Sequence, residues 1–422
     1  MSQLLNILKK DTIYFFILSA VAATLFVPKY SINSMAMIVL VLTWLLKMDM
    51  KNIYRVQQNK IIYAFLLLYL VFLIGIFYSE NIKGANKLLS LRLPIVLFPL
   101  ICLTIGKFSV SQTKLFKNIF IFSALAACLY CHACIIGKWL ESGTGFMELF
   151  KSREYSYMYI TNYIDLHPTY FSYLLILCLL FIETKLNSKI SLKYKTLLFA
   201  IGTYFVLFII HMTSKIALIG LVLLFFFYLG RSIYQKKYKN SLVLLSLLVL
   251  GIFTASRFEY TVKRYKEVIH IFIPQKKVVH SNEGYRLYSM QAFKEEFPKH
   301  PIMGIGLADG QKQLDVYYEK IGFPHMKGLN YHNQYVQILI EHGIIGFVVF
   351  IIALLWPVIL SIKRKNKEFF LFLVTTILFL LAENMFIRHK GLVSFALFNA
   401  LFLFTLTNQV IPKEPTNEIQ SN

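Results

Sequence analysis

The sequence predicts an all-α polytopic membrane protein with about twelve transmembrane helices and one large, partly helical loop outside the membrane. The composition is 57% hydrophobic and 16% aromatic, with a mean hydropathy of +0.60, which is more apolar than a soluble domain. Apolar runs of about 15 to 25 residues recur along the whole chain, and this is the length that spans a bilayer. A transmembrane barrel would show short alternating segments instead.

The apolar runs define the predicted helices and, between them, the loops. The helices centre near residues 12–28, 33–47, 61–78, 91–106, 118–137, 168–184, 196–211, 215–230, 241–255, 336–361, 369–387 and 391–408. Residues 1–255 therefore hold nine helices, with a smaller loop near 138–167. Residues 256–335 form the large loop, 336–410 hold three helices, and 411–422 form a polar tail.

Lysine and arginine residues set the orientation, because they accumulate in cytoplasmic loops. Five of the short loops are basic, and in a twelve-helix arrangement all five lie on the side of the N-terminus. Their cations are Lys47, Lys51, Arg55, Lys60, Lys107, Lys114, Lys117, Lys185, Lys189, Lys193, Lys195, Arg231, Lys236, Lys237, Lys239, Lys363, Arg364, Lys365 and Lys367. That side is predicted to be cytoplasmic and to hold both termini, and the loops 138–167 and 256–335 then lie outside.

The formal net charge is +23, and attraction to anionic membrane lipids explains most of this excess. The large outer loop is also basic, however, which predicts an anionic ligand on the outer face. Its cations include Arg257, Lys263, Arg264, Lys266, Lys276, Lys277 and Arg286. Nucleic acid is not expected as a partner of a chain that lies within the membrane.

The large loop contains two predicted helices. One extends from about Asn282 to Phe297 and is ended by Pro298. The other begins at Asp309 as the N-cap and ends at Gly322.

Tyr331-His332-Asn333-Gln334-Tyr335-Val336-Gln337 places an imidazole where the loop meets an apolar helix. Ionisable groups at a membrane usually mark functional sites. An imidazole can act as a base near neutral pH, and a guanidinium such as that of Arg286 binds phosphate through two hydrogen bonds. The loop has no metal-binding motif, phosphate loop or dinucleotide fingerprint, so neither a metal nor another cofactor is predicted.

The spacing of these residues resembles the signature of the O-antigen ligase and polymerase superfamily. The residues that carry the resemblance are Arg286, His300, Pro301, Gly304, Gly306, the segment from His332 to Gln337, Glu341, Gly343 and Gly346. A weaker similarity extends to Arg92, His167, Thr213-Ser214-Lys215 and Glu383. The family often has Ser-Arg where this chain has Ser214-Lys215, so the charge is kept while the forked guanidinium is lost.

The resemblance implies a glycosyltransferase of the bacterial inner membrane that works on the periplasmic side in cell-envelope assembly. Such enzymes take a glycan from undecaprenyl pyrophosphate and transfer it to a hydroxyl group without a metal or nucleotide. The expected acceptor is lipid A–core, which would make this an O-antigen ligase of lipopolysaccharide biosynthesis. The alternatives are an O-antigen or exopolysaccharide polymerase and a protein O-oligosaccharyltransferase, and a lipid-glycan transporter is a candidate of a different class.

The resemblance also implies roles for individual residues. His332 and Arg286 are the expected catalytic residues, as base and as diphosphate-binding group. The expected substrate-binding residues are Lys215, Arg92, Asn333, Gln337, His167 and Tyr335. The expected turn residues are Gly304, Gly306, Gly343 and Gly346.

Five of these residues have structural alternatives. His332 could bond to a backbone carbonyl at a helix start, and Arg286 could pair with Glu283. Lys215 and Arg92 could extend to the lipid headgroups. His167 could be structural.

Overall fold

The computed structural model describes residues 10–47, 54–269 and 282–406, and it forms helices and turns with no strand among these residues. The larger helices are α2 (Lys10–Ala23), α3 (Tyr30–Lys47), α5 (Ile61–Ile74), α6 (Ile82–Arg92), α7 (Pro94–Ile105), α8 (Val110–Ser142), α11 (Pro168–Leu186), α12 (Leu192–His211), α13 (Lys215–Tyr234), α14 (Tyr238–Arg257), α15 (Glu259–Ile269), α16 (Asn282–Glu296), α17 (Asp309–Lys320), α18 (Gln334–Lys363), α19 (Lys367–Leu380) and α20 (His389–Ala400). The short elements are η1 (Thr24–Phe26), α4 (Tyr54–Gln58), α9 (Glu148–Lys151), η3 (Arg153–Tyr155), α10 (Met158–Thr161), η4 (Asn162–Ile164), η6 (Phe297–Lys299), η7 (Pro324–Met326), η8 (Met385–Ile387) and η9 (Leu401–Thr405).

A helix is found at each predicted apolar run, so the prediction of an all-helical fold is confirmed for the described residues. Seven helices in this part of the chain are long and apolar enough to cross a membrane, and they support a multi-pass membrane protein. They are Tyr30–Lys47, Ile82–Ile105, Val110–Ser142, Pro168–Leu186, Leu192–His211, Lys215–Tyr234 and Gln334–Lys363. The number of twelve transmembrane helices stays a prediction. The predicted tail 411–422 and the cations Lys276 and Lys277 lie outside the described residues.

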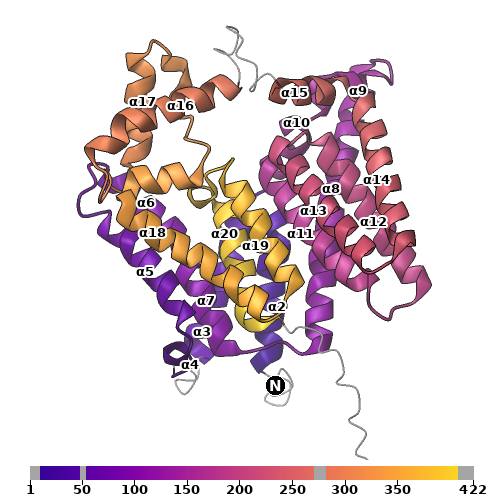
Figure 1. Ribbon diagram of the computed structural model, residues 1–422, viewed down its shortest axis with the longest axis horizontal. Helices are drawn as coiled ribbons and strands as arrows, with labels where there is room; N and C mark the ends of the chain where they lie inside the picture. The colour runs from indigo at the N-terminus through magenta and orange to yellow at the C-terminus, as the bar shows by residue number, and fades with distance from the viewer. Residues whose placement is uncertain (1–9, 48–53, 270–281, 407–422) are drawn as a thin grey trace, which may run out of the picture.

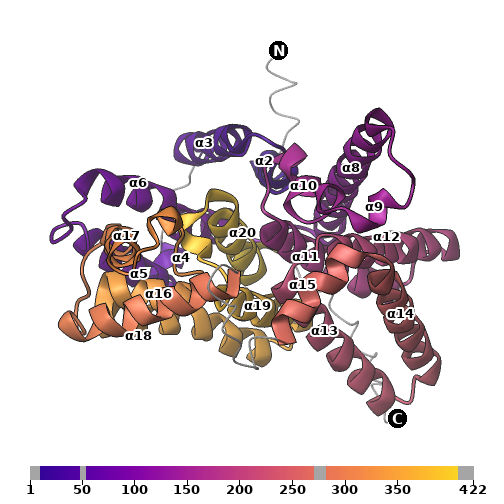
Figure 2. The same ribbon diagram turned by 90° about the horizontal axis from the view of Figure 1, so that it is seen from above.

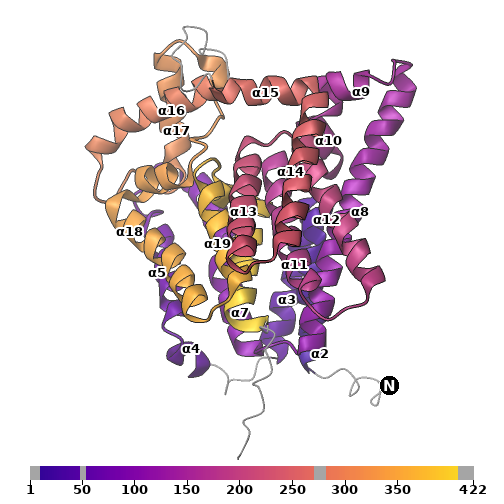
Figure 3. The ribbon, with the colours of Figure 1, turned by 45° about the vertical axis from the view of Figure 1, so that its right-hand side comes forward.

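The long helices lie side by side, and α15, α16 and α17 cover one of their two ends (Figure 1). We call residues 259–333, as far as they are described, the cap. The helix α2 begins at the opposite end of the bundle (Figure 3). The helix α11 lies in the middle of the molecule when it is seen from the cap side (Figure 2), and nearly all of its side chains are buried. The N-terminus of α11 is therefore held in place on the cap side by the surrounding packing.

The cap has its own hydrophobic core, which joins it to the beginning of α18. The buried side chains of this core are Ala292, Leu314, Tyr318, Met326, Tyr331, Val336 and Ile340. They come from α16, α17, the following loop and the first turns of α18. His332 lies between two of these buried residues in the chain, so packing of the cap determines where its backbone lies.

The start of α17 differs from the prediction. The N-cap is Ala308, with a φ of 73°, and not Asp309. The carboxylate of Asp309 instead accepts hydrogen bonds from the backbone N–H groups of Glu80, at 2.7 Å, and Asn81, at 2.9 Å. Asp309 thus joins the cap to the segment that precedes α6.

The helix α18 is broken at Gly343, whose φ of 59° and ψ of −162° are not helical. Its first part lies beneath the cap, and its second part descends along the bundle (Figure 3). The cap segment 301–306 fills the break through backbone hydrogen bonds. Ile344 N donates to Pro301 O at 2.9 Å, Ile305 N donates to Ile340 O at 2.9 Å, and Gly306 N donates to Glu341 O at 3.1 Å.

The helix α19 ends at Leu380, which is earlier than the predicted end near residue 387. Glu383 consequently lies in the turn between α19 and α20 and not inside a helix. This shift places its carboxylate on the cap side of the bundle.

Candidate active site

His332 occupies a strained position directly before α18. Its φ is 48°, in the left-handed region that non-glycine residues seldom adopt. The backbone N–H donates to Asn330 Oδ1 at 2.7 Å, which holds this turn. The side chain is 29% exposed, and its Nδ1 lies 3.8 Å from Glu383 Oε2. An imidazole and a carboxylate thus face one another, and the imidazole retains access to solvent.

Glu383 is the acidic member of this pair. Its side chain is only 10% exposed. Burial by itself would raise the pKa of the carboxyl group, but His332, His167 and Arg286 favour the charged form more strongly, so the pKa is lowered. Glu383 is therefore a carboxylate at neutral pH, and three cation-forming side chains surround it.

Arg286 approaches the same turn from the cap. It projects from α16 and donates a hydrogen bond from Nη2 to the backbone oxygen of Ala382 at 3.0 Å. The side chain is exposed overall, so part of the guanidinium is open to a ligand. The side chain of Glu283, the alternative partner, lies outside the described part of the structure.

His167 belongs to the same cluster through α11. It is the N-cap of this helix, and its Nδ1 accepts a hydrogen bond from Thr169 N at 3.3 Å. Burial lowers the pKa of its imidazole, and the nearby charge of Glu383 opposes this effect only in part. His167 thus has the structural role of a helix cap while it contributes to the electrostatics around Glu383.

A second guanidinium, that of Arg264 in α15, is stacked on Tyr157. The central carbon of Arg264 lies 3.7 Å from the centre of the tyrosine ring. The residue is 7% exposed, and its Nε has no hydrogen-bond partner. The positive charge of Arg264 contributes to lowering the pKa of the His167 imidazole. Arg264 therefore adds a buried cation beside the cluster.

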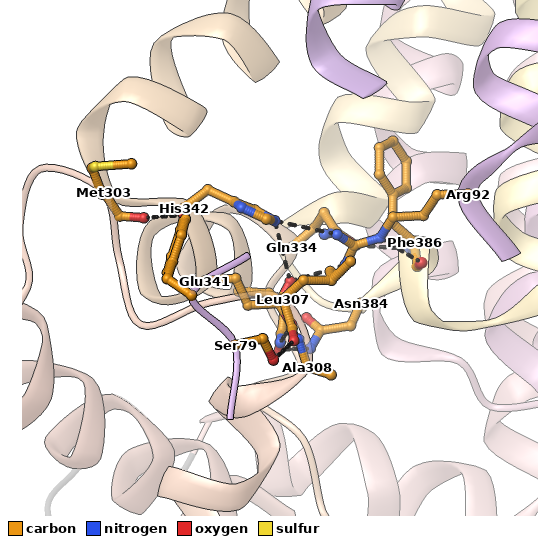
Figure 4. A network of polar contacts seen from close by, with 12 residues as sticks. Ser79, Arg92, Met303, Leu307, Ala308, Gln334, Glu341, His342, Asn384 and Phe386 are labelled. Atoms are coloured by element: carbon orange, nitrogen blue, oxygen red, sulfur yellow. Dashed lines mark hydrogen bonds and ion pairs between the residues drawn. The ribbon is translucent and has the colours of Figure 1, made fainter. Parts of the chain in front are cut away.

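Arg92 lies in a separate buried network (Figure 4). Its side chain and that of Glu341 are both 0% exposed and form an ion pair, with Nη2 and Oε2 3.0 Å apart. The guanidinium also lies 3.4 Å from His342 Nε2 and donates from Nε to Phe386 O. The side chain of Arg92 is thus enclosed by protein and has no contact with solvent.

Gln337 connects this network to the turn that carries Glu383. Its Nε2 donates to Glu341 Oε1 at 2.7 Å, and its Oε1 accepts from Asn384 Nδ2 at 2.8 Å. Gln334 also contacts the turn, because its Oε1 accepts from Phe386 N at 2.8 Å. Side chains of α18 therefore hold the segment on both sides of residue 385.

Asn333 and Tyr335 contact the protein at the start of α18. Asn333 is the N-cap, and its Oδ1 accepts from the N–H groups of Tyr335 and Val336 at 3.0 and 3.2 Å. The hydroxyl group of Tyr335 donates to Ile377 O in α19 at 3.1 Å. Both contacts fix the helix that follows His332.

Lys215 is the first residue of α13 and is half-buried. It follows a turn in which Thr213 has a φ of 51°. The helix α13 packs against α11 and α19. Lys215 therefore starts a helix next to those that carry His167 and precede Glu383.

Three of the four glycines lie where the chain turns. Gly304, Gly306 and Gly343 have φ values of 75°, 112° and 59°. A Cβ on Gly304 would lie 2.5 Å from the backbone of Glu341, so the close approach of cap and helix also requires glycine. Gly346 is different and corrects the expectation of a turn. It is helical, and there a Cβ would overlap His342 and lie 3.2 Å from Val71.

Sequence reasoning did not select Arg264, Tyr157 or Asn384 as site residues. Tyr157 resembles the interfacial tyrosines around it, and Arg264 is one of many loop cations. Arg264 and Tyr157 are 107 positions apart in the sequence, and Asn384 is 47 positions from its partner Gln337. No local pattern therefore distinguishes them.

Two comparisons with known proteins complete these observations. Residues 197–351 match the family model described as O-antigen ligase. A comparison with curated proteins gave no match. The matched region extends from α12 through the cap into α18, and it includes Lys215, Arg286 and His332. This match supports the resemblance to the O-antigen ligase and polymerase superfamily over the matched residues.

Proposed function

We propose that this protein transfers a glycan from undecaprenyl pyrophosphate to an acceptor hydroxyl group, and that the acceptor is lipid A–core. The observation that carries the proposal is the convergence of His332 and Arg286 on one short turn, Ala382–Glu383. The two residues are 46 positions apart in the sequence and come from different elements. A base and a phosphate-binding cation on one side of a membrane bundle suit a lipid-diphosphate donor.

In the proposed reaction, His332 Nε2 accepts the proton of the acceptor hydroxyl group. The acceptor oxygen then forms a bond with the anomeric carbon of the glycan, and the bond from this carbon to the diphosphate oxygen breaks. The electron pair of that bond leaves with the polyprenyl diphosphate. Arg286 stabilises the additional negative charge on this leaving group.

Glu383 is proposed to orient His332. With Nδ1 facing the carboxylate, the other ring nitrogen is directed to the acceptor, and the imidazolium that forms is stabilised by the negative charge. Glu383 is thus a positioning residue and does not touch the substrate.

We propose roles for the remaining predicted site residues on the basis of their contacts. Arg92 and Gln337 are proposed to position the 381–388 turn through Glu341 and Asn384. Asn333 and Tyr335 are proposed to fix the direction of α18. Lys215 and His167 remain candidates for binding the donor diphosphate.

The proposed location is the bacterial inner membrane, with about twelve transmembrane helices, both termini in the cytoplasm and the cap in the periplasm. The basic loops on the side opposite the cap support this orientation. A transporter is less well supported, because its cations would be needed midway across the membrane. The buried Arg92 is neutralised by Glu341, whereas Arg286 lies at the cap side of the bundle.

The test is transfer by the purified full chain in proteoliposomes. A synthetic polyprenyl-diphosphate glycan and a lipid A–core acceptor are supplied without nucleotide, with and without EDTA. We expect transfer in both cases and a loss of about 10²–10⁴-fold in His332→Ala, because a general base is removed. A His332→Ala variant that transfers at the wild-type rate would contradict the assignment. Val316→Ala, at an exposed position of α17, serves as the matched control.

A deletion strain separates the alternatives. Loss of all capped lipopolysaccharide indicates a ligase, whereas capping with single repeat units indicates a polymerase. Loss of glycoproteins with intact lipopolysaccharide indicates a protein O-oligosaccharyltransferase.

A further inference from the structure

The cap segment that enters the break in α18 has an unusual surface. Ile302 and Met303 are 63% and 49% exposed, although both are apolar and belong to a rigid segment. Next to them, Ile344 and Ile345 at the start of the descending part of α18 are 50% and 53% exposed. Phe77, in the segment after α5, is 82% exposed. We call these five residues the wedge patch.

Hydrogen bonds hold the wedge patch together. Ile345 N donates to Ile302 O at 3.2 Å, and Ile344 N donates to Pro301 O at 2.9 Å. The hydroxyl group of Tyr78, which follows Phe77, donates to Met303 O at 2.7 Å. The exposed apolar side chains thus come from three parts of the chain that are fixed to one another, and not from a loose loop.

The wedge patch continues an apolar surface that faces lipid. Along the descending part of α18, the exposed side chains are Ile344, Ile345, Val348, Ile352, Leu355, Ile359 and Ile362. This helix is one of those able to cross a membrane, so its exposed apolar face adjoins acyl chains. Ile302 and Met303 extend this face beyond the helix and into the cap.

We infer that the wedge patch is inserted in the outer leaflet, in contact with lipid acyl chains. An exposed patch of large apolar side chains is unfavourable in water. Backbone groups within a membrane must be hydrogen-bonded to protein, and the carbonyls of Pro301, Ile302 and Met303 all accept hydrogen bonds. The exposed apolar side chains and the bonded carbonyl groups of this segment therefore both favour insertion.

This insertion would fix the position of His332 relative to the membrane surface. The segment 301–306 is bonded to the first part of α18, and His332 lies directly before that part. Lipid contact at one end of this rigid unit would thus hold the imidazole at the level of the headgroups, where a lipid-linked diphosphate lies. The inference about lipid contact depends only on the chain spanning a membrane, and this consequence depends on the proposed function.

Nitroxide labelling tests the inference. Ile302→Cys is labelled in proteoliposomes of phosphatidylethanolamine and phosphatidylglycerol, and collisions with oxygen, which enriches in acyl chains, are compared with those of a water-soluble nickel chelate. Ile352→Cys, on the lipid-facing side of α18, gives the membrane reference, and Val316→Cys, on α17, gives the aqueous one. The unmodified chain corrects for labelling of its five native cysteines.

We expect the label at position 302 to resemble that at position 352, with frequent oxygen collisions and at least about 10-fold fewer nickel collisions than at position 316. Frequent nickel collisions at position 302 would place the patch in water and overturn the inference. Protection from both reagents would mean that protein, such as a second copy of the chain, covers the patch, which also overturns it. Ile345→Cys is the second reporter if Ile302→Cys does not fold. The wild-type transfer assay is independent of these results, so a failure here is distinguishable from a failure of the proposed function.

Discussion

His332 combines three properties that seldom occur together in one residue. It has a positive φ without being glycine, its Nδ1 faces a buried carboxylate, and its side chain is partly open to solvent. A left-handed conformation of a non-glycine residue costs about 1–3 kcal/mol and persists only when the surroundings impose it. Here Asn330 accepts a hydrogen bond from the backbone of His332, and Asn333 caps the helix that follows, so the geometry of the imidazole is maintained at some cost in stability.

Replacing Glu383 by Gln tests the pairing at this scale. The amide keeps the shape of the side chain but removes the charge that stabilises the imidazolium. We expect the kcat of transfer to fall by between about 10-fold and the ~10⁴-fold seen when a catalytic histidine loses its carboxylate partner, with little change in KM. Steady-state kinetics in proteoliposomes measure both quantities. A variant with raised KM and unchanged kcat would show that Glu383 binds substrate instead.

Some of the candidate residues can be identified from the sequence, whereas the surroundings of others cannot. His332 and Arg286 are recognisable because their types suit the chemistry and because of the motif around His332. Arg92 is visible as a charge within apolar sequence, but its partner Glu341 is 249 positions away, so a sequence pattern cannot reveal that the pair is enclosed. The location of Glu383 cannot be predicted from a sequence pattern either, because Glu383 reaches the cap side only through the early end of α19.

At the scale of elements, the network between α6 and α18 joins two parts of the bundle that are distant in sequence. Arg92 is the last residue of α6, and Glu341 ends the first part of α18. A buried ion pair is expensive to break, because the remaining charge is left without a partner in a medium of low polarity. Each member of the pair therefore requires the other for these two helices to pack stably.

A double-mutant cycle measures this requirement. We expect Arg92→Met and Glu341→Gln each to destabilise the protein by about 3–5 kcal/mol, seen as a large fall in Tm in detergent. The double variant Arg92→Met/Glu341→Gln should recover much of the loss, since no unpaired charge remains. Additive effects in the double variant would mean that the two side chains act independently.

The break in α18 leads to a prediction about the stability of variants at Gly343. A Cβ on Gly343 would overlap the carbonyl oxygen of Ile302, and a φ of 59° with a ψ of −162° is essentially restricted to glycine. Gly343→Ala should therefore cost about 3 kcal/mol or more, measured as a lower Tm. Gly230→Ala in α13, where nothing lies within 4 Å of the added Cβ, should be neutral or stabilising by about 0.5–1 kcal/mol. Equal Tm values for the two variants would contradict this account.

The elements themselves were well predicted, because long apolar runs leave few alternatives to helices in a membrane. The break at Gly343 is less visible. Its surroundings are a continuous apolar run, and the hydrogen bonds that replace the helical ones come from residues 301–306. The short helices α9 and α10 were not predicted, because each has only 4 residues, too few for a periodic pattern to be distinct. The helix α15, with 11 residues, was not predicted either.

For the whole molecule, the distribution of charge predicts which side faces the cytoplasm. Val316→Cys in the cap and Lys236→Cys at the opposite end, both exposed, can be treated with a membrane-impermeant maleimide in spheroplasts. We expect labelling at position 316 only, and labelling at position 236 only after the membrane is permeabilised. The reverse pattern would invert the topology and with it the proposed periplasmic reaction.

The joining of the cap to α18, and the location of Glu383 beyond α19, also determine the order in which this molecule matures. Chains are synthesised from the N-terminus at about 5–20 residues per second, so the cap leaves the ribosome before the helix that it is bonded to. The histidine is then present in a nascent chain that still lacks its acidic partner. The proposed reacting centre is therefore completed only after the turn that follows α19 has been synthesised, and a polypeptide halted before Glu383 cannot assemble it.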